Sequence, residues 1–130
     1  MKTNVLVSIS LIALLAATFG FAQSQSLNAK IPFQFTVEGK VLPAGQYVFI
    51  RSNDESTIRV EGASKGPSSV ALVVTRLGSA IHTSPQDAHI VFDKVGDTYF
   101  LSEIWIPGLD GFLVYVTKGK HEHRTVDVPK

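Results

Sequence analysis

The sequence predicts an all-β protein, either an antiparallel β-sandwich or a small β-barrel, preceded by a signal peptide. Short segments of alternating apolar and polar residues recur along the chain, and glycine and proline cluster between them. No window after the first 22 residues shows a capped apolar repeat of 3.6 residues. We expect about seven or eight short strands in one domain over residues 30–130, behind a flexible lead at 23–29, and their spacing fits a sandwich and a barrel equally well.

Residues 1–22 have the pattern of a signal peptide. An apolar run over 5–17 follows a basic second residue, and Gly20 and Ala22 are small residues at positions −3 and −1 of a cleavage site. The run is shorter than the roughly 20 residues of a membrane-spanning helix, and the chain has no cysteine to carry a lipid anchor. We therefore expect an exported protein, periplasmic or extracellular, without a transmembrane segment after cleavage.

The charge balance and the absence of cysteine exclude several classes of function. The chain has 12 Lys and Arg against 11 Asp and Glu, and loss of Lys2 with the signal would make these numbers equal. This balance, without a basic cluster, argues against nucleic acid, because binding to phosphates requires concentrated Lys and Arg. The absence of cysteine excludes disulfides, thiol catalysis and Cys-ligated zinc. Stability must then come from one hydrophobic core.

Four strands are expected in the first half of the domain, at residues 31–37, 46–51, 57–61 and 70–74. The first alternates apolar residues with Gln34 and Thr36, which is the period of a half-buried strand. Pro43 and Gly45 occupy positions i+1 and i+3 of a type I turn before the second. The fourth is apolar at both parities, which favours a strand covered on both faces.

Four more strands are expected at residues 89–95, 98–106, 112–117 and 125–128, after a long loop at 78–87. The clearest hairpin joins the first two, because Gly96-Asp97 puts glycine at the first central position of a type II′ turn. This turn sets Phe92 opposite Leu101 and Asp93 opposite Phe100. In this register one face carries Ile90, Phe92, Leu101 and Trp105.

Three motifs of strand and turn residues, spread over most of the chain after the signal, are similar to motifs of a known group of proteins. They are Ile31-Pro-Phe-Gln-Phe-Thr-Val37, Leu42-Pro-Ala-Gly-Gln-Tyr47 and Asp97-Thr-Tyr-Phe-Leu-Ser-Glu-Ile-Trp105. Together they resemble a large family of short, exported, uncharacterised bacterial proteins. The resemblance implies an all-β exported domain and brings no activity or catalytic residue with it. Each aromatic residue in these motifs would contribute on the order of 2 to 3 kcal/mol if fully buried.

His121 and His123 are the best candidates for chemistry. On an extended segment residues i and i+2 point the same way, so both imidazoles would face one Cu²⁺ or Zn²⁺ ion. A third ligand would be His82, His89 or Asp127. The alternative is a solvated tail, because lysine, arginine and glutamate surround the pair.

No catalytic residues are predicted. The loop that holds His82 also contains serine and aspartate, but no Gly-x-Ser-x-Gly turn accompanies it. Asp93 and Glu103 would suit sugar hydrolysis only as a facing pair. The expected register puts them on opposite faces, so Asp93 is expected to be a surface charge. Trp105 is expected either in the core or as a ring on which a ligand stacks.

The sequence therefore favours a non-enzymatic binding or interaction module of the cell envelope. The sequence does not identify the partner of this module, which would lie in the envelope or outside the cell. A metal-binding protein that uses His121 and His123 is the second hypothesis, and a hydrolase is the third.

Overall fold

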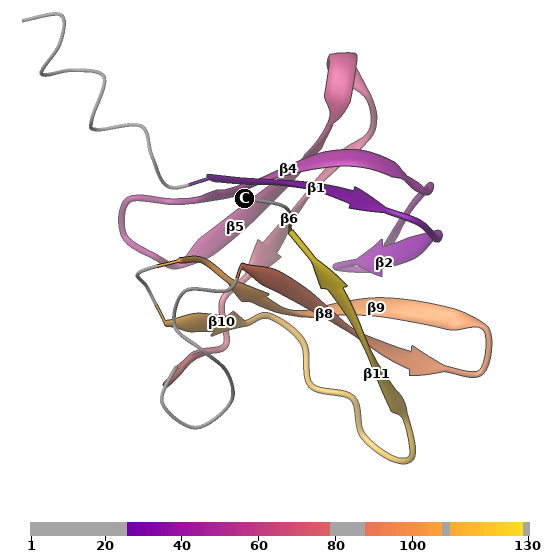
Figure 1. Ribbon diagram of the computed structural model, residues 1–130. Coiled ribbons are helices and arrows are strands. Elements are labelled where there is room, and N and C mark those ends of the chain that lie inside the picture. Colours follow the sequence, from indigo (N-terminus) through magenta and orange to yellow (C-terminus); the bar gives the residue numbers. More distant parts are fainter. Residues whose placement is uncertain (1–25, 79–87, 108–109, 129–130) are drawn as a thin grey trace, which may run out of the picture.

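The computed structural model describes residues 26–78, 88–107 and 110–128, and these form strands with one short 3₁₀ turn (Figure 1). The expected signal peptide and nearly all of the expected loop at 78–87 lie outside the described residues. Within the described residues, no helix has the length and apolar character needed to cross a membrane.

The strands form two sheets. The first is antiparallel, in the order β1 (Ser26–Ile31), β4 (Gly45–Arg51), β5 (Thr57–Gly62) and β6 (Ser68–Leu72). The second runs β11 (Glu122–Asp127), β8 (His89–Val95), β9 (Thr98–Trp105), β10 (Gly111–Leu113) and β7 (Thr75–Leu77). The hairpin of β2 (Phe35–Val37) and β3 (Lys40–Leu42) joins the second sheet through a parallel contact between Thr36 and Phe100.

The predicted all-β class is confirmed, with three differences in detail. The described residues contain eleven strands, more than expected, because several are only three residues long. The contact between β2 and β9 is parallel, so the second sheet is mixed. The two sheets remain separate in the described residues and do not close into one barrel.

The hydrophobic core lies between the two sheets, which face each other in Figure 1. Both sheets contribute fully buried side chains, among them Ile31, Tyr47, Phe49, Ile58, Phe35, Phe92, Ile104 and Phe112. One apolar face of each sheet is thereby removed from water, which is the main stabilising term for such a fold.

The chain enters the first sheet earlier than expected. Residues 26–29 are not a flexible lead but the start of β1, where Leu27, Ala29 and Ile31 are buried at alternate positions. The expected strand at 31–37 is divided at Pro32, which cannot donate to a ladder. β1 pairs with β4 in the first sheet, whereas β2 belongs to the second.

The prediction that residues 70–74 are covered on both faces is wrong. Val70 is 47% exposed and Leu72 is 60% exposed, because they lie on the outer face of their sheet and only the face of Ala71 meets the core. The apolar run reflects an exposed outer face at a sheet edge.

The β8–β9 hairpin has the expected register, with Phe92 opposite Leu101 and Asp93 opposite Phe100. Gly96 has φ +60°, as the first central position of a type II′ turn requires. Between Val91 and Phe92 the register shifts by one residue, because β9 carries a bulge there: Val91 pairs with Glu103, whereas Phe92 pairs with Leu101. Ile104 therefore joins the core face, and the predicted place of Trp105 on that face is wrong.

Candidate metal site

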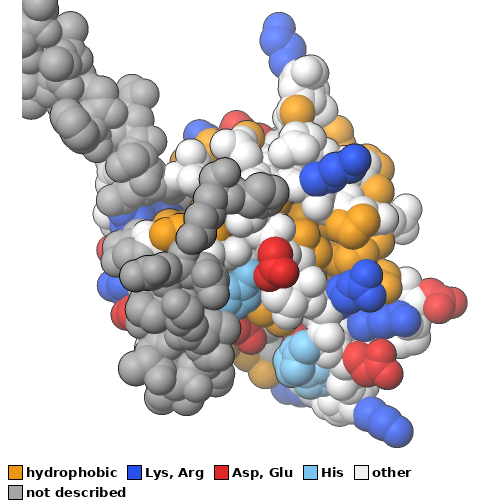
Figure 2. All heavy atoms as spheres, in the orientation of Figure 1, with side chains coloured by type: hydrophobic (Ala, Val, Ile, Leu, Met, Phe, Trp, Pro, Cys, Tyr) orange, Lys and Arg blue, Asp and Glu red, His pale blue; other side chains and the backbone are white. Residues whose placement is uncertain are grey.

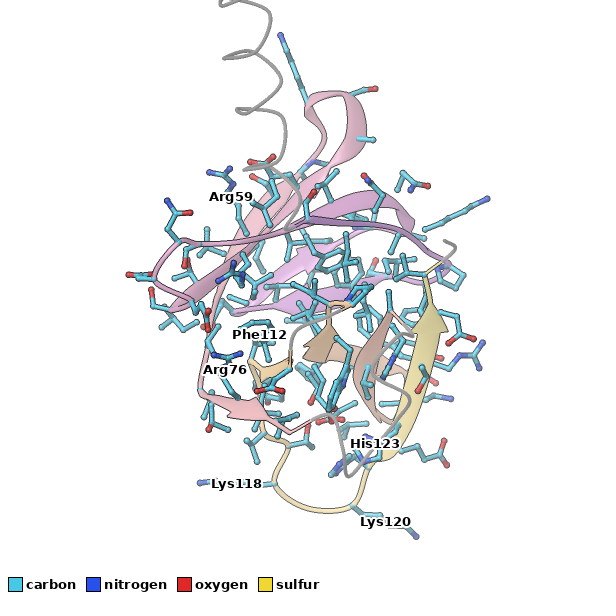
Figure 3. The ribbon with its side chains drawn as sticks, turned by 60° about the vertical axis from the view of Figure 1, so that its left-hand side comes forward. Arg59, Arg76, Phe112, Lys118, Lys120 and His123 are labelled. Carbon is cyan, nitrogen blue, oxygen red and sulfur yellow. The ribbon has the colours of Figure 1, made fainter. Side chains whose placement is uncertain are left out.

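Three metal-ligating side chains converge where β11 begins: Asp93, His121 and His123. One donor atom from each lies within 4.8 Å of the other two. Figure 2 shows histidine side chains at the surface on the lower part of this face, and Figure 3 shows His123 on β11 beside the connection that carries Lys118 and Lys120.

Strand pairing brings the three residues together. β11 pairs antiparallel with β8, and His123 lies directly opposite Asp93. Side chains of directly opposed residues project to the same side of a sheet. His121 precedes His123 by two residues, so it reaches the same side, which is the orientation expected from the His-x-His spacing.

The donor atoms surround one carboxylate oxygen. His123 Nδ1 lies 3.0 Å from Asp93 Oδ1, and His121 Nε2 lies 3.9 Å from the same oxygen. The two imidazole rings are nearly perpendicular, at 88°, with their centroids 5.0 Å apart. The two nitrogens and the oxygen therefore converge without the rings stacking on each other.

Neighbouring groups orient these ligands. Thr117 Oγ1 donates a hydrogen bond of 2.7 Å to Asp93 Oδ2, which leaves Oδ1 for another partner. His121 Nδ1 lies 2.9 Å from the carbonyl oxygen of Gly119. Because a carbonyl only accepts, Nδ1 is the donor in this contact, and Nε2 is the ring nitrogen that faces Asp93. Such hydrogen bonds typically orient ligands in metal sites.

Asp93 is buried, contrary to its expected place on the surface. Its side chain is 3% exposed, and Oδ1 lies 3.0 Å from His123 Nδ1, an ion pair when that imidazole is protonated, but accepts no well-aligned hydrogen bond in the described residues. Burial of a carboxylate is costly unless its oxygens are well paired. A cation held between Oδ1 and the two imidazoles would neutralise the charge and satisfy the oxygen.

The other proposed third ligands lie elsewhere. His89 is at the opposite end of β8, about 13 Å along the strand from Asp93 at 3.3 Å per residue. It pairs in register with Asp127 on β11 and stacks with Trp105 at a centroid distance of 5.5 Å. His82 lies outside the described residues, as do the serines and aspartate of its loop.

Trp105 faces away from the main core and is 3% exposed. Its Nε1 donates to Glu103 Oε1 at 2.9 Å, and Gly111 approaches the ring so closely that a Cβ there would lie 2.6 Å from it. In this conformation the indole packs against protein groups and is not presented to solvent as a stacking surface.

Lysines near the site are directed outward. Lys118 and Lys120 extend away from the body of the molecule (Figure 3). The carboxylate of Asp93 lies directly beside the imidazoles, with Oδ1 3.0 Å from His123 Nδ1. This local arrangement favours a cation.

No family model, curated protein or solved structure matches this chain. The resemblance to exported bacterial β proteins therefore stays a prediction. The chemical interpretation rests on the geometry of Asp93, His121 and His123.

Proposed function

We propose that this protein is an exported, non-enzymatic β domain that binds a divalent transition metal, Cu²⁺ or Zn²⁺. The ligands are Asp93 Oδ1, His121 Nε2 and His123 Nδ1. The observation that carries the proposal is the buried Oδ1 of Asp93, which accepts no well-aligned hydrogen bond in the described residues and lies 3.0 and 3.9 Å from two imidazole nitrogens.

The donor set suits these ions. Two imidazole nitrogens and one carboxylate oxygen are ordinary ligands of Zn²⁺ and Cu²⁺, whereas Cu⁺ prefers the thiolate and thioether groups that this site lacks. Ligand atoms bound at 2.0–2.1 Å to a tetrahedral ion are about 3.3 Å apart. The two separations from Asp93 Oδ1, 3.0 and 3.9 Å, bracket this value, and all three donor atoms lie within 4.8 Å of one another, so side-chain movements would bring them to bonding geometry.

The proposal gives a specific form to the binding module expected from the sequence. Three protein ligands leave a tetrahedral ion one position for water or an external ligand. The export signal expected at residues 1–22 supports a role outside the cytoplasm.

Calorimetric titration with Cu²⁺ and Zn²⁺ tests the proposal. We expect one ion per chain with a dissociation constant in the micromolar range or tighter, which corresponds to about −8 kcal/mol. His121→Ala combined with His123→Ala should abolish this binding. Asp93→Asn, which removes the charge but keeps the shape, should weaken it at least about tenfold.

Glu122→Gln is the matched control, because Glu122 lies between the two histidines and is exposed. The Glu122→Gln variant should bind Cu²⁺ and Zn²⁺ with the affinity of the wild type. Binding weaker than micromolar, or binding that persists in the double histidine variant, would exclude this site.

A further inference from the structure

We propose that the bound metal fastens residues 117–124 to β8, so that metal occupancy controls whether this segment is docked or open. We call residues 117–124 the clasp. The inference rests on the proposed metal site and adds a conformational consequence to it.

The clasp has little hydrophobic anchorage. The first residues of β11, Glu122, His123 and Arg124, are all exposed. Val126 and Val128, which follow the clasp, pack partly against the core, and the Val128 N–H donates to the Ala88 carbonyl at 3.0 Å. The C-terminal end of β11 is thus held by apolar contacts, whereas the clasp depends on ladder hydrogen bonds and on its contacts with Asp93.

Without metal, the clasp is held to Asp93 only weakly. His123 Nδ1 lies 3.0 Å from Asp93 Oδ1, but the His123 side chain is 61% exposed and Oδ1 accepts no well-aligned hydrogen bond in the described residues. Opening of the clasp would let water reach the carboxylate, which is 3% exposed when the clasp is docked, so part of the cost of burying it favours the open state. Thr117 compensates only Oδ2.

With metal, the balance reverses. Two ligands belong to the clasp and the third belongs to β8, so the complete site exists only when the clasp is docked. A ligand that binds one of two states more tightly shifts the equilibrium toward that state by its difference in affinity. Metal binding should therefore close the clasp.

Limited trypsin digestion of the full chain, with and without Zn²⁺, measures the open population. Lys118, Lys120 and Arg124 are exposed cleavage sites in the clasp, and Lys65 is an exposed site in the short 3₁₀ turn of Ala63–Lys65. At zinc concentrations near 100 times the dissociation constant, cleavage in the clasp should slow about tenfold or more. Cleavage after Lys65 should not change, which controls for an effect of zinc on trypsin.

Hydrogen exchange provides a second readout. Zinc should slow amide exchange at residues 122–124 more than at 126–128, because only the first group depends on the metal. The His121→Ala/His123→Ala variant should show no zinc response in either experiment. Asp93→Asn should show a less open clasp than wild type without metal, since it buries no charge, and a weaker response to zinc.

The outcomes separate the two proposals. If calorimetry shows zinc bound at the site while digestion and exchange of the clasp stay unchanged, the clasp inference is wrong and the metal site stands. If wild-type protein binds neither Zn²⁺ nor Cu²⁺, both are wrong. If Asp93→Asn opens the clasp more than wild type does, burial of the carboxylate is not what destabilises the metal-free docked state.

Discussion

Thr117 contacts the candidate site without being one of its three proposed metal ligands. Its hydroxyl donates to Asp93 Oδ2 at 2.7 Å and directs Oδ1 toward the two histidines. Groups in this position usually affect a metal site by holding a ligand in place and by setting how strongly it donates.

We expect Thr117→Val to weaken binding of Zn²⁺ about 10- to 100-fold, because the shape is kept while the hydrogen bond is lost. Calorimetric titration measures the change. Thr125→Val is the control, since Thr125 is an exposed threonine on the same strand as His123 and should leave the affinity as it is. Equal affinities for all three proteins would mean that Thr117 does not orient Asp93.

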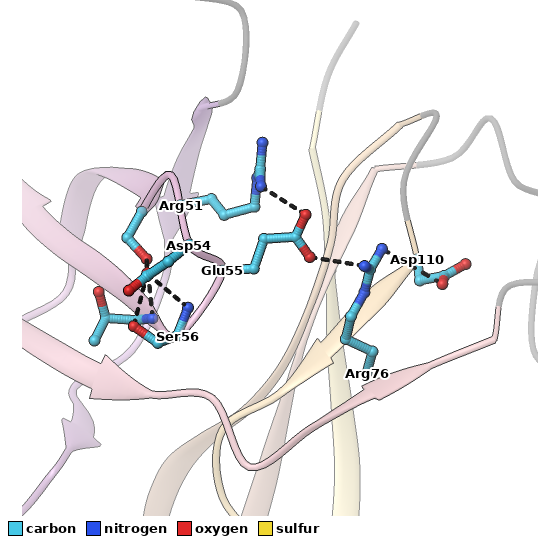
Figure 4. Close-up of polar contacts among 8 residues, drawn as sticks. Arg51, Asp54, Glu55, Ser56, Arg76 and Asp110 are labelled. Carbon is cyan, nitrogen blue, oxygen red and sulfur yellow. Dashed lines mark hydrogen bonds and ion pairs between the residues drawn. The ribbon is translucent and has the colours of Figure 1, made fainter.

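Asp54 forms a second local network, in the turn between β4 and β5 (Figure 4). The hydroxyls of Ser56 and Ser52 donate to its Oδ1 at 2.7 and 2.8 Å, and the Ser56 N–H donates at 3.1 Å. These hydrogen bonds, that of the Ser56 hydroxyl first, lower the pKa of Asp54 from 3.8 to about 2.

This lowered pKa predicts a pH dependence of stability. The ionised form is favoured in the folded state, so its contribution is present above pH 4 and is lost as the pH falls from about 4 through about 2. Urea unfolding at pH 6, 4 and 2.5 should therefore show a larger acid-induced loss for wild type than for Asp54→Asn. Parallel losses in the two proteins would contradict a role for Asp54.

At the scale of secondary structure, an ion-pair chain connects the two sheets (Figure 4). Glu55, in the β4–β5 turn, binds Arg51 at 2.9 Å and Arg76 of β7 at 2.7 Å. Arg76 also lies 3.5 Å from Asp110 and over the ring of Phe112. The Arg51 side chain is 7% exposed, so Glu55 is the anion that compensates a nearly buried cation.

We expect Glu55→Ala to destabilise the fold by about 1 to 3 kcal/mol, because it leaves the Arg51 guanidinium buried without its partner. Glu61→Ala is the control, since the Arg59–Glu61 pair is 56% and 43% exposed and should contribute less than about 1 kcal/mol. Urea unfolding near neutral pH measures both. Similar losses for the two variants would show that burial of Arg51 does not matter.

At the scale of the whole molecule, local pairing could be predicted from the sequence and distant pairing could not. The β8–β9 register follows from one two-residue turn with alternating neighbours, and it is confirmed. The pairing of β11 with β8 joins segments far apart in the chain, and no residue pattern specifies it. This is also why His121 and His123 were recognisable as a pair while Asp93 was missed.

The free edge of β6 is covered by a segment from elsewhere in the fold. β6 ends the first sheet and exposes Val70 and Leu72, yet the β2–β3 turn lies along its free edge. Glu38 Oε1 accepts from the Leu72 N–H at 3.1 Å, and Lys40 Nζ donates to the Ser68 carbonyl at 2.8 Å. An apolar edge strand with free backbone groups is a template for association between chains, and such side chains block it.

The turn that delivers Glu38 has a specific backbone requirement. Glu38 and Gly39 have φ of 49° and 76°, the pair of positive values that a type I′ hairpin turn needs. We expect Glu38→Ala combined with Lys40→Ala to keep this hairpin but uncover the β6 edge, so that the average mass in sedimentation velocity rises with concentration more steeply than for wild type. Glu61→Ala with Lys65→Ala removes the same two charges away from this edge and should behave as wild type does. If both double variants sediment like the wild type while circular dichroism shows them folded, the two side chains do not protect the edge, and the exposed apolar face of β6 does not by itself drive association.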